Sequence, residues 1–157
     1  MASSLPKPRP LAACLADARF SDEVKALLRG AAVETTRLGH RFISGEHLLI
    51  ALIASDDPVG HVFRAAGATA EQVRSRVEFI VPHDPPFLIP KEMNVGPRLI
   101  ALLEDAAEIS EGMEIRVEAP EIALALLHDR EGIPSRVLDE CHVNTRALTQ
   151  RLRLLQG

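Results

Sequence analysis

Three polar residues in the first half of the chain, His40, Glu46 and His47, are of the types that bind metals or transfer protons. Adjacent residues on a helix point about 100° apart, so Glu46 and His47 cannot converge on one ion as ligands spaced four positions apart would. A histidine in such a loop is more often held by structural hydrogen bonds than by a metal. We therefore expect structural histidines, no metal site and no cofactor.

Candidates for covalent catalysis are equally scarce. Cys14 precedes the first long helical pattern, and Cys141 lies in an apolar helical stripe next to His142. A thiol in such a stripe is usually buried and reduced, and two cysteines do not make a disulfide framework. No serine occupies a nucleophile elbow, and adjacent acids such as Asp56 and Asp57 fall at expected helix ends. We therefore expect a protein that is not an enzyme.

The composition argues against several other functions. The 157 residues are 46% hydrophobic but only 3% aromatic, so alanine and leucine must fill most of a closely packed helical interior. A formal charge of −4 and the absence of Tyr and Trp argue against nucleic-acid binding. No apolar run is long enough to cross a membrane, and the N-terminus lacks a hydrophobic signal core. We expect a cytoplasmic protein with no nucleic-acid or membrane partner.

Residues 20–80 are predicted to form four helices. Ser and Thr, or Asp before Pro, precede each apolar pattern, and such residues cap helix N-termini. Gly39 can adopt the left-handed conformation that ends the first helix before a tight loop. The expected N-caps are Ser21, Ser44, Asp57 and Thr69. The buried stripe expected on the first helix consists of Val24, Leu27, Leu28, Ala31 and Leu38.

The remaining segments are expected to be irregular. Residues 1–19 are predicted to be a flexible tail and lead-in, because residues 1–10 alternate proline with Lys and Arg; a short helix is expected only within 11–19. Residues 81–94 contain four prolines and are predicted to be a stiff linker. The apolar triplet 87–89 in this linker is expected to cover the seam between the two halves, with a docking patch as the alternative.

Residues 95–155 repeat the order of the first four helices. Placing residue n over residue n+75 from Phe20 to Ile80 needs no gap, and it pairs Glu46 with Glu121. Identity between the halves is low, so the shared order of helix starts is the stronger sign of an internal duplication. Each unit alone would bury too little surface to be stable. We therefore predict an all-α domain, residues 20–157, made of two tandem four-helix repeats packed together.

With this repeat in view, the chain resembles the N-terminal domain of the Clp family of ATP-driven unfoldases, which implies pseudo-twofold symmetry between the repeats. The second half departs from the pattern, with Gly112-Met113-Glu114 in place of Leu-Gly-His. The sequence contains no Gly-x-x-x-x-Gly-Lys-Ser/Thr phosphate loop, so the resemblance is to the recognition end without the motor. The matching residues are Phe20-Ser21, Leu38-Gly39-His40, Ile43 and Glu46-His47-Leu48-Leu49.

The resemblance implies a non-catalytic module that recognises proteins or peptides and acts as an accessory or regulatory factor of a Clp chaperone–protease. The partners that it implies are Clp unfoldase or protease subunits, together with adaptor or substrate proteins. The alternative is a protein that binds or sequesters a small ligand, such as phosphoarginine or a peptide-like toxin, independently of the protease.

Some members of the family bind phosphorylated arginine through the Glu of the Glu-His pair and a hydroxyl residue at the start of the first helix. The matching positions here are Glu46 and Ser21, next to Phe20; Glu121 is kept in the second repeat, but Gly96 supplies no hydroxyl. A carboxylate can accept guanidinium N–H groups, and a helix N-terminus suits a phosphoryl group. The competing interpretation is that Glu46 is a first-turn acid and Ser21 only a helix cap.

Overall fold

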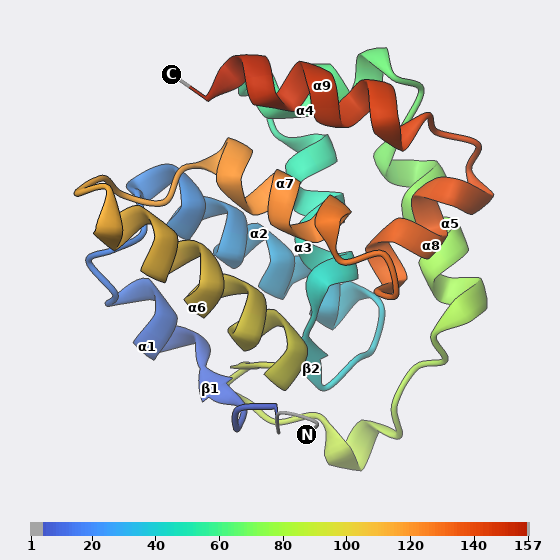
Figure 1. The fold of residues 1–157 in the computed structure, drawn as a ribbon. Coiled ribbons are helices and arrows are strands. Elements are labelled where there is room, and N and C mark those ends of the chain that lie inside the picture. Colours follow the sequence, from blue (N-terminus) through green and yellow to red (C-terminus); the bar gives the residue numbers. More distant parts are fainter. Residues whose placement is uncertain (1–4, 157) are drawn as a thin grey trace.

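The periodic apolar pattern folds into helices over most of residues 5–156, the part of the chain that this computed structural model describes (Figure 1). The first repeat consists of α2 (Asp22–Arg37), α3 (Gly45–Ala54), α4 (Pro58–Ala65) and α5 (Ala70–Ile80). The second consists of α6 (Pro97–Gly112), α7 (Ala119–His128), α8 (Ile133–Glu140) and α9 (Thr145–Leu155). The predicted all-α fold of two four-helix repeats is confirmed.

Side-chain caps fix the starts of several helices where the sequence predicts them. The Ser21 hydroxyl accepts a hydrogen bond from the Val24 N–H at 3.2 Å, and Asp57 Oδ1 accepts one from the Val59 N–H at 2.9 Å. Thr69 caps α5 in the same way. Gly39, with φ of 71°, adopts the predicted left-handed conformation after α2. These bonds satisfy N–H groups that a helix cannot satisfy internally.

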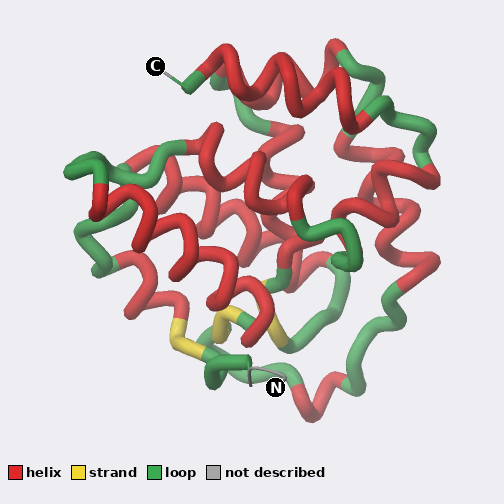
Figure 2. The backbone as a smooth tube through the Cα atoms, viewed as in Figure 1, coloured by secondary structure: helices red, strands yellow, loops and turns green. Residues whose placement is uncertain are grey.

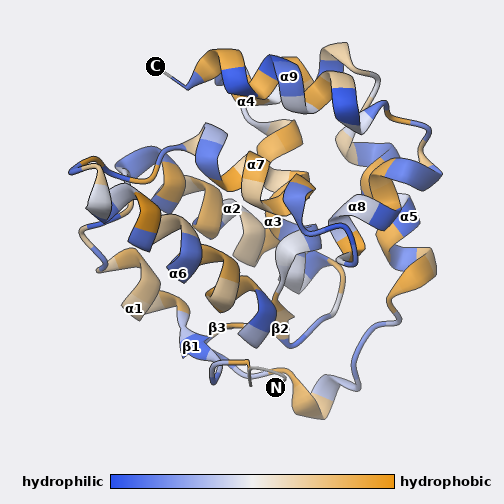
Figure 3. Cartoon of the chain, viewed as in Figure 1, coloured by the Kyte–Doolittle hydropathy of each residue, from blue (hydrophilic) through white to orange (hydrophobic). Residues whose placement is uncertain are grey.

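The centre of the molecule is formed by α3 and α7, the two most apolar helices (Figure 3). All residues of α3 from Glu46 to Ile53 are buried, so this helix is surrounded by other elements on every side. Around this pair the contacts exchange symmetrically: α4 packs against α9 as α8 packs against α5, and α3 contacts α8 as α7 contacts α4. This reciprocity is what a pseudo-twofold axis between the repeats requires.

Short backbone pairings also cross between the repeats (Figure 2). Strand β2 (Phe42–Ile43), between α2 and α3, pairs in parallel with β3 (Asn94–Val95), just before α6. In the reciprocal position, Phe20 just before α2 pairs in parallel with Val117 between α6 and α7. Each repeat therefore fastens the start of the other repeat's first helix.

Residues 9–10 differ from the prediction of a flexible tail, whereas a short helix within residues 11–19 was expected. Strand β1 (Arg9–Pro10) pairs antiparallel with β3, and α1 (Leu11–Leu15) follows it directly. Proline is tolerated because β1 is an edge strand, where its missing N–H is not needed. The Arg9 guanidinium bonds Glu104 at 2.8 Å, which fixes the segment to α6. Residues 1–4 of the predicted tail lie outside the described residues.

The linker triplet also differs from expectation. The short 3₁₀ turn Pro86–Leu88 leaves Phe87 85% exposed and Leu88 41% exposed, so these side chains do not cover the seam between the repeats. The apolar faces of α3, α7 and their neighbours already fill that seam.

Both cysteines are free thiols. Cys14 is fully buried and Cys141 is half-buried, less than its apolar stripe suggests, and burial raises the pKa of both thiols. Among the helices of residues 5–156, none combines the length and the apolar character needed to cross a membrane.

Two phenylalanines provide a test of the core. Phe63 on α4 is completely buried, whereas Phe79 on α5 is 79% exposed. Phe63→Ala removes a buried ring and leaves a cavity, so we expect it to lower the free energy of unfolding by about 3–5 kcal/mol. The matched control Phe79→Ala should change it by less than about 1 kcal/mol. Urea unfolding followed by circular dichroism measures both; equal losses would contradict this assignment of the core.

Candidate functional site

A buried chain of hydrogen bonds holds the two histidines at the start of α3. The Ser44 N–H donates to His47 Nδ1 at 2.9 Å, so the other ring nitrogen of a neutral His47 carries the proton. That nitrogen, Nε2, lies 2.8 Å from His40 Nδ1, and His40 Nε2 lies 3.2 Å from the Val81 carbonyl oxygen. The bonds therefore run in one direction, from the Ser44 N–H through both rings to Val81. The expectation of structural histidines is confirmed.

Burial shifts the pKa values of His47 and Glu46 at the start of α3. His47 is 1% exposed, and desolvation together with the nearby His40 lowers the pKa of His47 to about 3. Glu46 is 7% exposed, and its burial raises the pKa of its carboxyl group. Within residues 5–156, no metal-binding cluster of three or more His, Cys, Asp or Glu is present. The hydrogen bonds from His47 through His40 to the Val81 carbonyl therefore join the start of α3 to the end of α5.

The structure does not bring Ser21 and Glu46 together. They lie at opposite ends of the α2–α3 hairpin, and α2 alone, with 16 residues, is about 24 Å long. The Ser21 N–H donates to the Val117 carbonyl at 3.0 Å, so Ser21 faces the second repeat, while Glu46 lies on the side where the Gly96 N–H donates to Ile43 at 2.8 Å.

The surroundings of Ser21 do not suit a phosphoryl group. Its hydroxyl is used in capping α2, and the preceding Phe20 is only 1% exposed. Near this helix start, a hydrogen bond with Asp57, partial burial and the charge of Glu118 raise the pKa of Glu23 to about 7. Asp57 and Glu118 thus lie near Glu23 at this helix start, and acidic groups in these positions disfavour a bound anion.

Glu121 has a different structural role from Glu46. The N-caps of α2 and α6, Ser21 and Gly96, are 75 positions apart, but those of α3 and α7, Ser44 and Glu118, are 74 apart. Glu121 is therefore the third residue of α7, equivalent to His47. Its Oε1 accepts a hydrogen bond from the Glu118 N–H at 2.8 Å, as His47 Nδ1 does from Ser44. The gap-free pairing of Glu121 with Glu46 is wrong by one residue.

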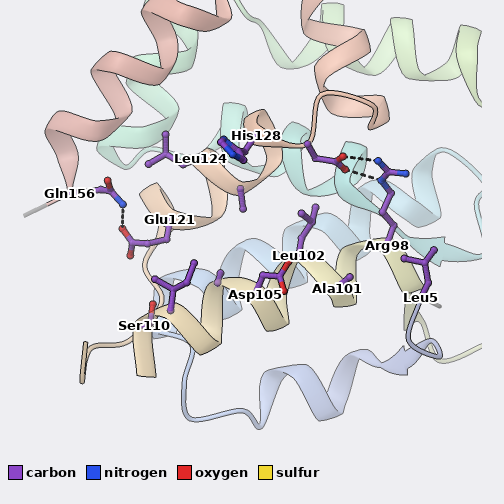
Figure 4. Close-up of a pocket in the computed structure, with 14 residues that line it drawn as sticks. Leu5, Arg98, Ala101, Leu102, Asp105, Ser110, Glu121, Leu124, His128 and Gln156 are labelled. Atoms are coloured by element: carbon purple, nitrogen blue, oxygen red, sulfur yellow. Dashed lines mark hydrogen bonds and ion pairs between the residues drawn. The ribbon is translucent and has the colours of Figure 1, made fainter. Parts of the chain in front are cut away.

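Glu121 also lines an open groove of about 670 Å³ between α6 and α7 (Figure 4). Its walls are mainly apolar. At one end Arg98 makes two bonds to Asp129, of 2.6 and 2.8 Å, and at the other the Gln156 amide donates to Glu121 at 3.2 Å. The apolar lining residues are Ala101, Leu102, Ala106, Ile109, Leu124 and Ala125, with Leu5 at the edge.

One sequence difference between the repeats lies in the wall of this groove. Gly30 on α2 lies where a Cβ atom would come within 3.3 Å of the Ala51 Cβ on α3. The equivalent pair in the second repeat, 75 and 74 positions later, is Asp105 and Ala125, and both line the groove. The glycine allows α2 to lie close to α3, and α6 and α7, where an aspartate stands at the equivalent position, contact each other less than α2 and α3 do.

A second difference between the repeats concerns a side chain that is buried and paired in the first repeat but exposed in the groove of the second. Glu34 on α2 is 7% exposed, and Arg74 of α5 donates to it twice, at 2.8 and 2.9 Å. The equivalent residue of α6 is Ile109, which lines the groove and is 66% exposed. An exposed isoleucine on the wall of an apolar groove is typical of a surface that binds another molecule.

The groove was not predicted from the sequence, although a signal was available. A comparison of the halves at a spacing of 75 residues places Asp105 on Gly30 and Ile109 on Glu34. Of the four predicted site residues, Glu121 alone lines the groove, with Phe20, Ser21 and Glu46 positioned elsewhere.

Comparison with known proteins agrees with this architecture. The family model described as "Clp repeat (R) N-terminal domain" matches residues 19–121, more than half of the chain. The chain belongs to the Clp N-terminal domain family. The resemblance inferred from the sequence is thereby confirmed.

Similar proteins include ATP-binding subunits of Clp proteases and N-terminal domains of Clp proteins. The chain is 29% identical over 140 residues to the Guillardia theta "ATP-dependent Clp protease ATP-binding subunit ClpA homolog", covering 87% of this chain but 17% of that protein. The N-terminal domain of ClpD from Arabidopsis thaliana is 24% identical with a TM-score of 0.70, over 88% of this chain and 96% of that one. A ClpV N-domain in complex with a VipB peptide is 22% identical with a TM-score of 0.63, over 97% of both chains. This chain thus spans less than a fifth of the curated relatives' length.

The histidine chain predicts a specific response to pH. The folded state holds His47 neutral with a pKa of about 3, whereas an unfolded histidine has a pKa near 6.5. The contribution to stability is therefore complete above about pH 6.5. Between that value and about pH 3, acid lowers the free energy of unfolding by about 1.4 kcal/mol per pH unit.

The variant His47→Gln isolates this effect, because a glutamine can still complete a capping box but does not titrate. We expect the difference in unfolding free energy between wild type and variant to shrink as the pH falls from 7 to 4. His61→Gln, at an exposed position, is the control and should leave the pH dependence unchanged. Urea titrations at several pH values measure this; a difference that does not vary with pH would contradict it.

Proposed function

We propose that this protein is a non-catalytic recognition module that binds a protein or peptide segment in the α6–α7 groove and serves a Clp chaperone–protease as an accessory or regulatory factor. The observation that carries the proposal is the groove itself. It is large enough for a peptide, its walls are apolar, and the ionic and amide pairs at its ends can position a bound chain.

Two further observations support this proposal. Membership of the Clp N-terminal domain family connects the chain with unfoldase subunits, and the structurally similar ClpV N-domain has been seen with a VipB peptide. The proposed partners are Clp unfoldase or protease subunits, adaptors or substrates. Ser110 and His128 both line the groove, but among the described residues no hydrogen bond joins the Ser110 hydroxyl to a base, which supports binding over catalysis.

A pair of matched variants tests the groove. Ile109→Asp places a carboxylate on the groove wall, whereas Val33→Asp makes the same type of change at a position on α2 that is 62% exposed and lies outside the groove. Burying a carboxylate against apolar side chains is unfavourable, so we expect Ile109→Asp to weaken partner binding at least tenfold, or about 1.4 kcal/mol. Val33→Asp should bind like the wild type, and both variants should keep the wild-type melting temperature within a few degrees.

The measurement is affinity capture with each immobilised protein, followed by mass spectrometry and by titration of the purified partner. Clp unfoldase or protease subunits should be retained by the wild type and by Val33→Asp. Retention of no Clp subunit by the wild type would contradict the accessory role and favour the alternative, a ligand-binding protein independent of the protease. Equal retention by Ile109→Asp would keep the role but exclude this groove as the site.

A further inference from the structure

A second groove, of about 750 Å³, lies between α7 and α9 and adjoins the first, because Leu124 and His128 of α7 line both. Its character is different. The α7 side contributes the apolar residues Leu124 and Leu127, while the rest of the lining is dominated by arginine, hydroxyl and amide side chains. The three arginines are Arg130, Arg146 and Arg153.

The positive charge of this groove is concentrated on α9. This helix carries three arginines and no acidic residue, in a chain whose formal charge is −4. Within residues 5–156, Arg146 and Arg153 take part in no ion pair. Arg130 is held at the groove by Asp139, at 3.2 Å, and donates to the Thr145 hydroxyl at 3.3 Å. Two free guanidinium groups therefore face the same hollow as a third that is already fixed.

The spacing of the free arginines defines what can bind. Arg146 and Arg153 are seven residues apart on α9, which is about two turns, so they lie on the same side of the helix about 10 Å from each other. A peptide in the polyproline II conformation has three residues per turn and rises about 3.1 Å per residue, so carboxylates three residues apart lie on one side of it, about 9 Å from each other. Leu124 of α7, which is half-buried, offers contact for an apolar side chain between these carboxylates.

We propose that the α7–α9 groove is a separate binding site for an acidic peptide segment, with carboxylates on Arg146 and Arg153 and an apolar side chain on Leu124. Carboxylate–guanidinium hydrogen bonds are among the stronger polar contacts in proteins. A nucleic acid fits this groove less well, because none of the lining residues is Phe, Tyr or Trp on which a base could stack. The site does not depend on the function proposed for the α6–α7 groove.

The probe for the experiment is a fluorescein-labelled peptide, Gly-Asp-Glu-Leu-Asp-Glu-Leu-Asp-Gly, whose binding is followed by fluorescence anisotropy. The comparison peptide carries Asn and Gln in place of the acids. The test variant is Arg146→Ala with Arg153→Ala, and the matched control is Arg151→Ala, an exposed arginine of the same helix that does not line the groove. Circular dichroism verifies that each variant is folded.

We expect the double variant to raise the Kd for the acidic peptide at least tenfold, and Arg151→Ala to change it less than about twofold. Binding should also weaken as sodium chloride rises from about 50 to about 500 mM, because salt screens exposed charges. No binding by the wild type, equal binding of the amide peptide, or an equal loss in Arg151→Ala would overturn the proposal. Tighter binding of single-stranded poly(U) RNA through the same two arginines would show that the ligand class is wrong.

Discussion

The mutual burial of α3 and α7 is the constraint on which the rest of the structure depends. Neither helix has a polar face wide enough to lie at a surface, so each can be stable only when the other repeat covers it. The exchanged strand pairings, Phe20 with Val117 and β2 with β3, fasten this arrangement at the two helix starts. The two repeats therefore form one folding unit, and the outer helices remain free to differ.

The α2–α3 and α6–α7 hairpins differ in how closely their two helices pack. The first is closed by the close approach of Gly30 to Ala51 and by the bonds from Arg74 to Glu34, and the histidine chain ties its loop to the end of α5. The second has an aspartate in place of the glycine and an exposed isoleucine in place of the paired glutamate. The same fold thus combines a sealed half with a half that carries grooves on both sides of α7.

Much of the fold could be predicted from the sequence, because caps and apolar periodicity are local signals. Ser21, Asp57 and Thr69 cap their helices as expected, and the order of helix starts revealed the duplication. The pairing of Arg9 and Pro10 with β3 was missed because it depends on an edge that exists only after folding. The predicted site combined Ser21 and Glu46 of the same repeat. In the structure the residues that begin α2 and α6 are hydrogen-bonded to the opposite repeat, so Ser21 and Glu46 are not neighbours. The segment between α6 and α7 is one residue shorter than the segment between α2 and α3. Two repeats of such low identity give no clear sequence signal for this difference.

The sharing of Leu124 and His128 between the two grooves has a consequence for how occupants would influence each other. A ligand bound in one groove restricts the rotamers of Leu124 and His128 that are available to a ligand in the other groove. Two molecules bound at once would therefore be linked energetically through a single turn of α7, without any movement of the backbone. Such linkage is reciprocal, so each ligand changes the affinity for the other by the same factor.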